Sequence, residues 1–109
     1  MFVTPTLCSS HKLNCLSALI KRMIKLCESF KYGVLSGKRD FSVQLSMFSG
    51  NGERYVKHID STLTGASRKL TMIFYLNEVV EGGSLRIYNN DSEYYDVEPQ
   101  LGRLVLFRR

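Results

Sequence analysis

The stretch SLRIYNNDSEYYDV, residues 84–97, decides the fold class of this chain of 109 residues. Apolar and polar side chains alternate in Ser84–Tyr88, and aromatic and charged side chains fill Glu93–Val97, which predicts two short strands. Asn89-Asn90-Asp91 lies between them and is a turn signal, because asparagine and aspartate favour tight turns. The stretch therefore predicts two consecutive strands in a mainly β domain.

Further strand patterns lie on both sides of this stretch. Downstream, a turn at residues 99–102 leads into the apolar run Arg103–Phe107. Upstream, the sequence predicts three more strands, at Phe41–Met47, Tyr55–His58 and Leu70–Leu76. Six short strands separated by turn residues are typical of a sandwich, a barrel or a jelly roll.

An amphipathic helix is predicted at residues 12–30, before the strands. Its apolar side chains recur at steps of three and four, and they are Leu13, Leu16, Ile20, Met23, Cys27 and Phe30, widened by Leu19 and Ile24. Ser9 or Ser10 can cap its start and Gly33 follows its end. We expect this helix to support the β core and residues 1–11 to be flexible.

Composition excludes several classes of protein. Hydrophobic residues make up 44% and charged residues 23% of the chain, which argues against disorder, collagen and coiled coil. No apolar run approaches the roughly 20 residues of a membrane helix, and no secretory signal is apparent. We therefore expect an intracellular protein, cytoplasmic or nuclear or both, with no membrane partner.

The cysteines and the charge have simple structural explanations. Cys8, Cys15 and Cys27 are odd in number and form no CxxC pair, so we expect reduced thiols, with Cys15 and Cys27 on the apolar face of the helix. The net charge of +5 leaves nucleic-acid binding open. However, Lys21, Arg22 and Lys25 lie opposite the apolar stripe, so a solvated helix face is the better explanation.

The candidate for chemistry is the pair His58 and Asp60. At a spacing of two on a strand, both side chains project from the same face. An imidazole and a carboxylate are two of the three ligands of the 2-His-1-carboxylate triad that binds Fe(II). The alternative is a surface histidine that is hydrogen-bonded to a neighbouring aspartate, and the spacing alone favours that alternative.

The surrounding residues resemble a known family. Phe48–Asp60, FSGNGERYVKHID, is similar to the first iron-ligand segment of the hypoxia-inducible-factor (Egl nine type) prolyl hydroxylases, which are Fe(II)- and 2-oxoglutarate-dependent dioxygenases. The likeness continues in order through Ile73–Asn77, Gly82–Ile87 and Asp96–Pro99. It covers roughly residues 16–107, and several linked motifs in one order are more specific than a lone pair of ligands.

The resemblance implies a set of site residues. His58 and Asp60 would coordinate Fe(II), and Tyr75 would bind the distal carboxylate of 2-oxoglutarate. Tyr55 would line the mouth of the site, and Thr71 and Leu85 would line the cosubstrate pocket. No further catalytic residue is assigned. Phe48 stands where the family usually has tyrosine.

The resemblance also implies an activity. A proline in a protein substrate would be hydroxylated with O₂, while 2-oxoglutarate is decarboxylated to succinate and CO₂. Ascorbate would be an additional cofactor, oxygen sensing is an implied role, and a nucleic-acid partner is not expected.

The implied fold is an incomplete double-stranded β-helix, or jelly roll, with an N-terminal support helix. Residues 41–107 would supply about six of its eight core strands. The family's second histidine ligand and its 2-oxoglutarate-binding arginine have no counterpart before Arg109. We therefore expect residues 1–109 to form one partial domain, a C-terminally truncated fragment. Two alternatives remain, a catalytically inactive remnant or interaction module, and a small basic β-protein that binds nucleic acid.

Overall fold

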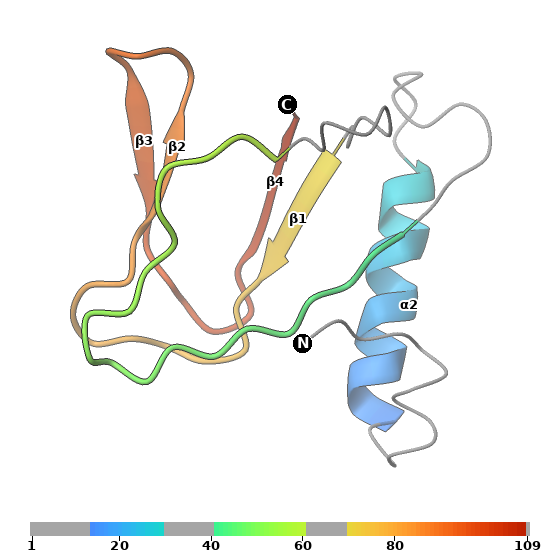
Figure 1. Cartoon of the computed structure of the whole chain (residues 1–109). Helices are drawn as coiled ribbons and strands as arrows, with labels where there is room; N and C mark the ends of the chain where they lie inside the picture. The colour runs from blue at the N-terminus through green and yellow to red at the C-terminus, as the bar shows by residue number, and fades with distance from the viewer. Residues whose placement is uncertain (1–13, 30–40, 61–69, 109) are drawn as a thin grey trace. The chain divides into compact units, whose positions relative to one another are not determined.

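The computed structural model describes residues 14–29, 41–60 and 70–108 (Figure 1). Predictions for residues 1–13, 30–40 and 61–69, including the helix caps and Cys8, lie outside these ranges. The chain divides into two compact units between Glu53 and Arg54. Within the described ranges the regular elements are one helix and four strands: α2 (Asn14–Ser29), β1 (Leu70–Phe74), β2 (Leu85–Tyr88), β3 (Tyr94–Val97) and β4 (Leu104–Arg108).

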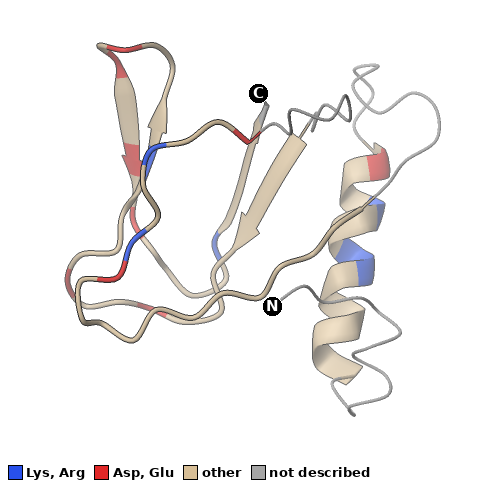
Figure 2. Ribbon diagram, in the orientation of Figure 1, with Lys and Arg blue, Asp and Glu red and all other residues tan. Residues whose placement is uncertain are grey.

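The helix α2 confirms the amphipathic pattern in the first unit. Its residues include no glycine or proline, and leucine, alanine, lysine and methionine favour helical backbone. Ile20 is only 3% exposed and packs with Leu16, Ile24, Val43 and Leu45. The basic side chains Lys21, Arg22 and Lys25 are exposed as expected, and Figure 2 shows the blue Lys and Arg positions on the ribbon of α2.

The burial predicted for the two helix cysteines is confirmed at one position and wrong at the other. Cys27 is buried, but Cys15 is exposed. Ser17 is buried in addition, which the apolar pattern did not predict. The buried face therefore passes through Ser17, Ile20 and Cys27, and Cys15 lies outside it near the first turn of the helix.

The strand predicted at Phe41–Met47 is wrong. Only Gln44 forms a β-bridge, and the rest of the segment has no ladder. Val43 and Leu45 are nevertheless partly buried while their neighbours are exposed. Phe41 and Met47, the other two apolar residues of the predicted pattern, are exposed. The alternation therefore predicted the inward side chains in the middle of the segment only, and it could not predict a ladder, because a ladder also needs a partner strand.

In the second unit, β1 and β4 form an antiparallel pair. Leu70 lies opposite Arg108, and Phe74 lies opposite Leu104. The pairing continues past the end of β1, where the Tyr75 amide donates to the Arg103 carbonyl over 3.0 Å. The Gly102 amide donates to the Tyr75 carbonyl over 2.9 Å. Gly102 has a φ of 78°, a value that glycine adopts without strain, so this turn closes tightly.

The predicted strands in residues 84–97 form the antiparallel hairpin β2–β3. Leu85 pairs with Val97, Arg86 with Asp96 and Tyr88 with Tyr94. The turn is closed by the Asn89 amide, which donates to the Glu93 carbonyl over 3.0 Å. In β2, Leu85 and Ile87 are partly buried, whereas Arg86 and Tyr88 are exposed. In β3 only Val97, opposite Leu85, is partly buried, so the inward face is limited to one end of the hairpin and to Ile87.

The strand predicted at Tyr55–His58 is also wrong, since residues 53–60 have no regular secondary structure. The described residues therefore contain two antiparallel strand pairs rather than six strands. The incomplete jelly roll stays a prediction. In the described ranges, no helix has the length and apolar character that crossing a membrane requires.

Candidate functional site

His58 and Asp60 meet although their segment is not a strand. His58 Nε2 lies 3.0 Å from Asp60 Oδ1, and His58 Nδ1 lies 2.7 Å from the Val56 carbonyl oxygen. The side chain of His58 is 54% exposed and that of Asp60 is 22% exposed. The two side chains predicted to project together therefore do so, with the imidazole open to solvent.

The hydrogen-bond geometry of this pair suits a cation. Both ring nitrogens of His58 face oxygen acceptors, and a neutral imidazole has only one N–H to donate. When Nδ1 donates to Val56, the lone pair of Nε2 points toward the carboxylate of Asp60. An imidazole nitrogen and a carboxylate oxygen that converge in this way fit two coordination positions of a ferrous ion. A backbone carbonyl that accepts from the other nitrogen is the usual support of a metal-binding histidine.

Thr71 supports the same pair from β1. Its Oγ1 donates to Asp60 Oδ2 over 2.8 Å, in a partly buried hydrogen bond. This contact orients the carboxylate so that Oδ1 faces His58. By resemblance Thr71 was expected to line a cosubstrate pocket, whereas the structure shows its hydroxyl on the predicted iron ligand. No sequence motif could have indicated the contact, because the two residues are eleven positions apart on different segments.

Tyr55 lies against the imidazole. Its ring and that of His58 have centroids 6.1 Å apart and meet edge to face at 68°. The Tyr55 side chain is largely solvent-exposed. An edge-to-face contact of this kind restrains the imidazole. The predicted place of Tyr55 beside the metal ligands agrees with this geometry, and its role stays a prediction.

Tyr75 and Leu85 lie on other elements. Tyr75 directly follows β1 and is partly buried, and burial raises the pKa of its phenol while the positive charge of Arg103 opposes the rise. Arg103 is held by the Glu98 carbonyl and the side-chain oxygen of Gln100. Leu85 begins β2 and is partly buried. Neither belongs to the hydrogen-bonded group of His58, Asp60 and Thr71 in the described residues.

The predicted turn before this segment is present in the first unit. Ser49 donates to Glu53 Oε2 from its amide over 2.6 Å and from its hydroxyl over 2.8 Å. These two hydrogen bonds lower the pKa of the Glu53 carboxyl. Between them, Gly50 and Gly52 have φ angles of 87° and 77°, which only glycine adopts readily.

The structure brings together two of the three side chains that a facial triad needs. Within residues 14–29, 41–60 and 70–108, no group of three His, Cys, Asp or Glu side chains could hold a metal ion. His58 and Asp60 are these two side chains, and Thr71 orients the second of them.

Comparisons with known proteins identify the family. Residues 43–109 match the family described as the 2OG-Fe(II) oxygenase superfamily. Prolyl hydroxylase EGLN3 of Mus musculus is 35% identical over 100 residues, which cover 87% of this chain and 41% of the mouse protein. The hypoxia-inducible factor prolyl hydroxylase of Caenorhabditis elegans is 41% identical over 68 residues, which cover 58% of this chain and 9% of that protein. Egl nine homolog 1 of Homo sapiens is 38% identical over 68 residues, covering 58% of this chain and 16% of that protein.

The matches cover most of this chain but a minority of each relative. Even the mouse prolyl hydroxylase is matched over only 41% of its length. No solved structure matches the chain significantly.

Proposed function

This chain belongs to the 2OG-Fe(II) oxygenase superfamily, and from that premise we propose that it carries part of the active site of a peptidyl-prolyl hydroxylase. The substrates would be a proline-containing protein, O₂ and 2-oxoglutarate, with succinate and CO₂ formed together with the hydroxylated proline. The single observation that supports this function best is the convergence of His58 Nε2 and Asp60 Oδ1 within a segment that matches the family.

Each described site residue has a part in this proposal. His58 and Asp60 would hold ferrous iron, and Thr71 would keep the Asp60 carboxylate turned toward it. Bound Fe(II) supplies the oxidising chemistry together with 2-oxoglutarate and O₂. Tyr55 would restrain the imidazole and cover the entrance to the pair.

Tyr75 would bind the distal carboxylate of 2-oxoglutarate. A tyrosine phenol is protonated at neutral pH, and burial raises the pKa of this one further, so the hydroxyl can donate to a carboxylate. Leu85 would supply an apolar wall to the cosubstrate pocket. The rest of the proposal follows the family: ascorbate as a further cofactor, a jelly-roll frame for these strands, a cytoplasmic or nuclear location, and oxygen sensing as the role.

Metal binding by the chain itself tests the site. We would titrate the 109-residue chain with Mn²⁺, a paramagnetic substitute for Fe(II), and follow free Mn²⁺ by electron paramagnetic resonance. His58→Ala and Asp60→Asn should each abolish the measurable binding. His11→Ala removes the other histidine of the sequence and is the matched control. Equal binding by wild type and His58→Ala would contradict the assigned ligands.

Turnover of the cosubstrate tests the activity. We would supply Fe(II), ascorbate, 2-oxoglutarate and a proline-containing peptide and measure succinate. The proposed enzyme forms succinate in amounts that depend on His58. Metal binding without succinate formation would reject the activity for this chain and favour a non-catalytic, metal-binding remnant.

A further inference from the structure

The segment that carries His58 and Asp60 has no ladder of its own, so something else must hold it. Thr71 holds it at Asp60 from β1. On the other side of His58, the side chain of Lys57 reaches the β2–β3 hairpin. The Lys57 ammonium lies 4.1 Å from the centroid of the Tyr88 ring and 3.5 Å from Asp91 Oδ1.

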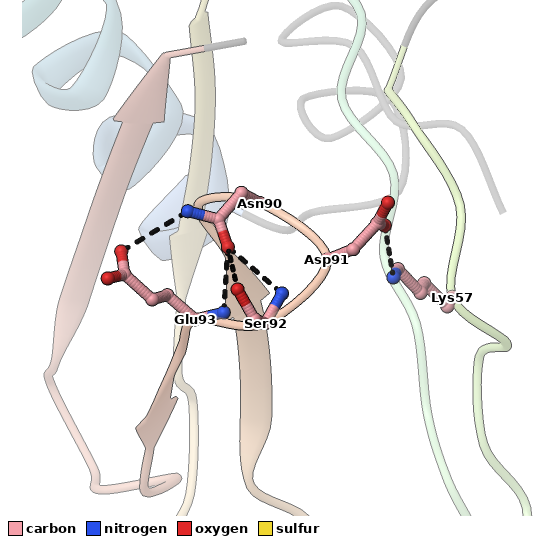
Figure 3. Close-up of polar contacts among 5 residues, drawn as sticks. All are labelled: Lys57, Asn90, Asp91, Ser92 and Glu93. Carbon is pink, nitrogen blue, oxygen red and sulfur yellow. Dashed lines mark hydrogen bonds and ion pairs between the residues drawn. The ribbon is translucent and has the colours of Figure 1, made fainter.

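The loop that presents Asp91 is itself ordered by hydrogen bonds, as Figure 3 shows. Asn90 Oδ1 accepts from the Ser92 amide over 2.9 Å, from the Ser92 hydroxyl over 3.0 Å and from the Glu93 amide over 2.9 Å. Asn90 Nδ2 donates to Glu93 Oε2 over 3.3 Å. The side chain of Asn90 thus fixes the backbone of Ser92 and Glu93, the two residues that follow Asp91. The carboxylate of Asp91 is directed away from the loop toward Lys57 (Figure 3).

The ring that Lys57 covers is supported as well. Tyr88 packs against Tyr94 with ring centroids 5.9 Å apart. The Arg86 guanidinium lies 3.9 Å from the centroid of the Tyr94 ring. Arg86 is in turn fixed by two hydrogen bonds of 2.8 and 2.7 Å to Asp96. Asp96, Arg86, Tyr94 and Tyr88 therefore form a connected row on the outward face of the hairpin, and Lys57 contacts the Tyr88 end of this row.

We propose that Lys57 is a positioning residue of the His58–Asp60 pair, which fastens the segment to the β2–β3 hairpin. That the pair binds a metal ion rests on the proposed function, whereas the contact of Lys57 with Tyr88 and Asp91 does not. Each contact alone is weak, because Asp91 is fully exposed and the lysine about half exposed. Together, a contact with a ring and a contact with a carboxylate restrain the same ammonium group. Because His58 is the next residue along the chain, this restraint also limits the position of the imidazole.

The metal affinity of lysine variants tests the proposal. Lys57→Met keeps a similar side-chain length and removes the charge, and it should raise the Mn²⁺ dissociation constant about three- to ten-fold. Lys57→Arg keeps both the cation–ring contact and the ion pair, so it should stay within about two-fold of wild type. Lys25→Met makes the same change at an exposed position of α2 and is the matched control. Equal affinities for Lys57→Met and Lys25→Met would overturn the proposal.

Partner variants show whether the effect passes through the hairpin. Asp91→Asn and Tyr88→Leu should each reproduce part of the loss. Either change added to Lys57→Met should weaken binding no further, because coupled partners are non-additive. The loss of Mn²⁺ affinity caused by Asp91→Asn should become smaller at high salt, whereas the loss caused by Tyr88→Leu should persist. Fully additive losses would place Lys57 outside this contact and overturn the proposal.

If the wild-type chain binds no Mn²⁺, the proposed function is refuted, but the role of Lys57 is not. Nuclear magnetic resonance of the metal-free chain then tests that role. In the metal-free chain, the ε-methylene protons of Lys57 should show a nuclear Overhauser contact with the Tyr88 ring and an upfield ring-current shift. The imidazole signals of His58 should move in Lys57→Met and stay in place in Lys57→Arg and Lys25→Met. An unchanged His58 spectrum in Lys57→Met would refute the positioning role.

Discussion

Replacing Thr71 with valine removes the hydroxyl that donates to Asp60 and leaves the shape of the side chain nearly intact. The lost contact is a 2.8 Å hydrogen bond to a carboxylate. Hydrogen bonds to charged groups contribute about 1.5–3 kcal/mol. The side chain of Asp60 is 22% exposed, so water can replace part of the lost hydrogen bond. The expected loss of free energy is therefore near the lower end of that range.

A loss of about 1.4 kcal/mol corresponds to roughly ten-fold in a dissociation constant. We therefore expect Thr71→Val to weaken Mn²⁺ binding about ten-fold in the absence of 2-oxoglutarate, which is also the low end for residues that orient metal ligands. Thr71→Ser keeps the hydroxyl and should stay close to wild type. Electron paramagnetic resonance of free Mn²⁺ gives all three constants under one set of conditions.

The absence of 2-oxoglutarate in that titration separates two roles for Thr71. A residue that only lines the cosubstrate pocket would change the affinity for 2-oxoglutarate and leave Mn²⁺ binding alone. A residue that orients Asp60 changes Mn²⁺ binding before any cosubstrate is added. Equal Mn²⁺ constants for Thr71→Val and Thr71→Ser would refute the orienting role.

Three further predictions concern stability. Arg86 lowers the pKa of Asp96 through its hydrogen bonds, so their stabilisation is present above the unfolded-state pKa and is lost as the pH falls through the lower, folded-state pKa. The thermal midpoint should therefore fall in acid, and this part of the fall should be missing in Arg86→Met. Asn90→Ala should cost about 1–2 kcal/mol in urea unfolding, because its carboxamide oxygen accepts three hydrogen bonds, and an unchanged midpoint would contradict this. Ile20→Ala should cost about 2–4 kcal/mol in the same assay, against less than about 0.5 kcal/mol for the exposed Leu26→Ala, and equal losses would refute Ile20 as the core of its unit.

Local elements of the fold could be predicted from the sequence. The helix at residues 14–29 follows from a 3.6-residue period within one segment, and the hairpin follows from a turn signal between two adjacent strands. The pairing of β1 with β4 could not be predicted in register, because its partners lie 30 to 38 residues apart. The irregular backbone at residues 53–60 was missed for a related reason, since it is held by side chains rather than by a ladder.

The candidate site divides in the same way. The approach of His58 and Asp60 could be predicted because both side chains belong to one short segment. The contacts proposed to support that pair join residues that no local spacing connects. Thr71 contacts Asp60, and Lys57 contacts Asp91 of the hairpin. Thr71 was expected at the site through family resemblance, but its partner Asp60 became visible only with the three-dimensional arrangement.

The unequal spans of the two strand pairs have a consequence for folding kinetics. The hairpin β2–β3 closes a loop of a few residues, an event that takes microseconds in isolated hairpins. The pairing of β1 with β4 must close a loop that contains the whole hairpin, and distant pairings form more slowly. The hairpin anchor of Lys57 is therefore expected to exist before β1 has found its partner. Thr71 and Asp60 are eleven positions apart, so their contact need not wait for that distant pairing. Both supports of the His58–Asp60 pair can therefore form before β4 is in place.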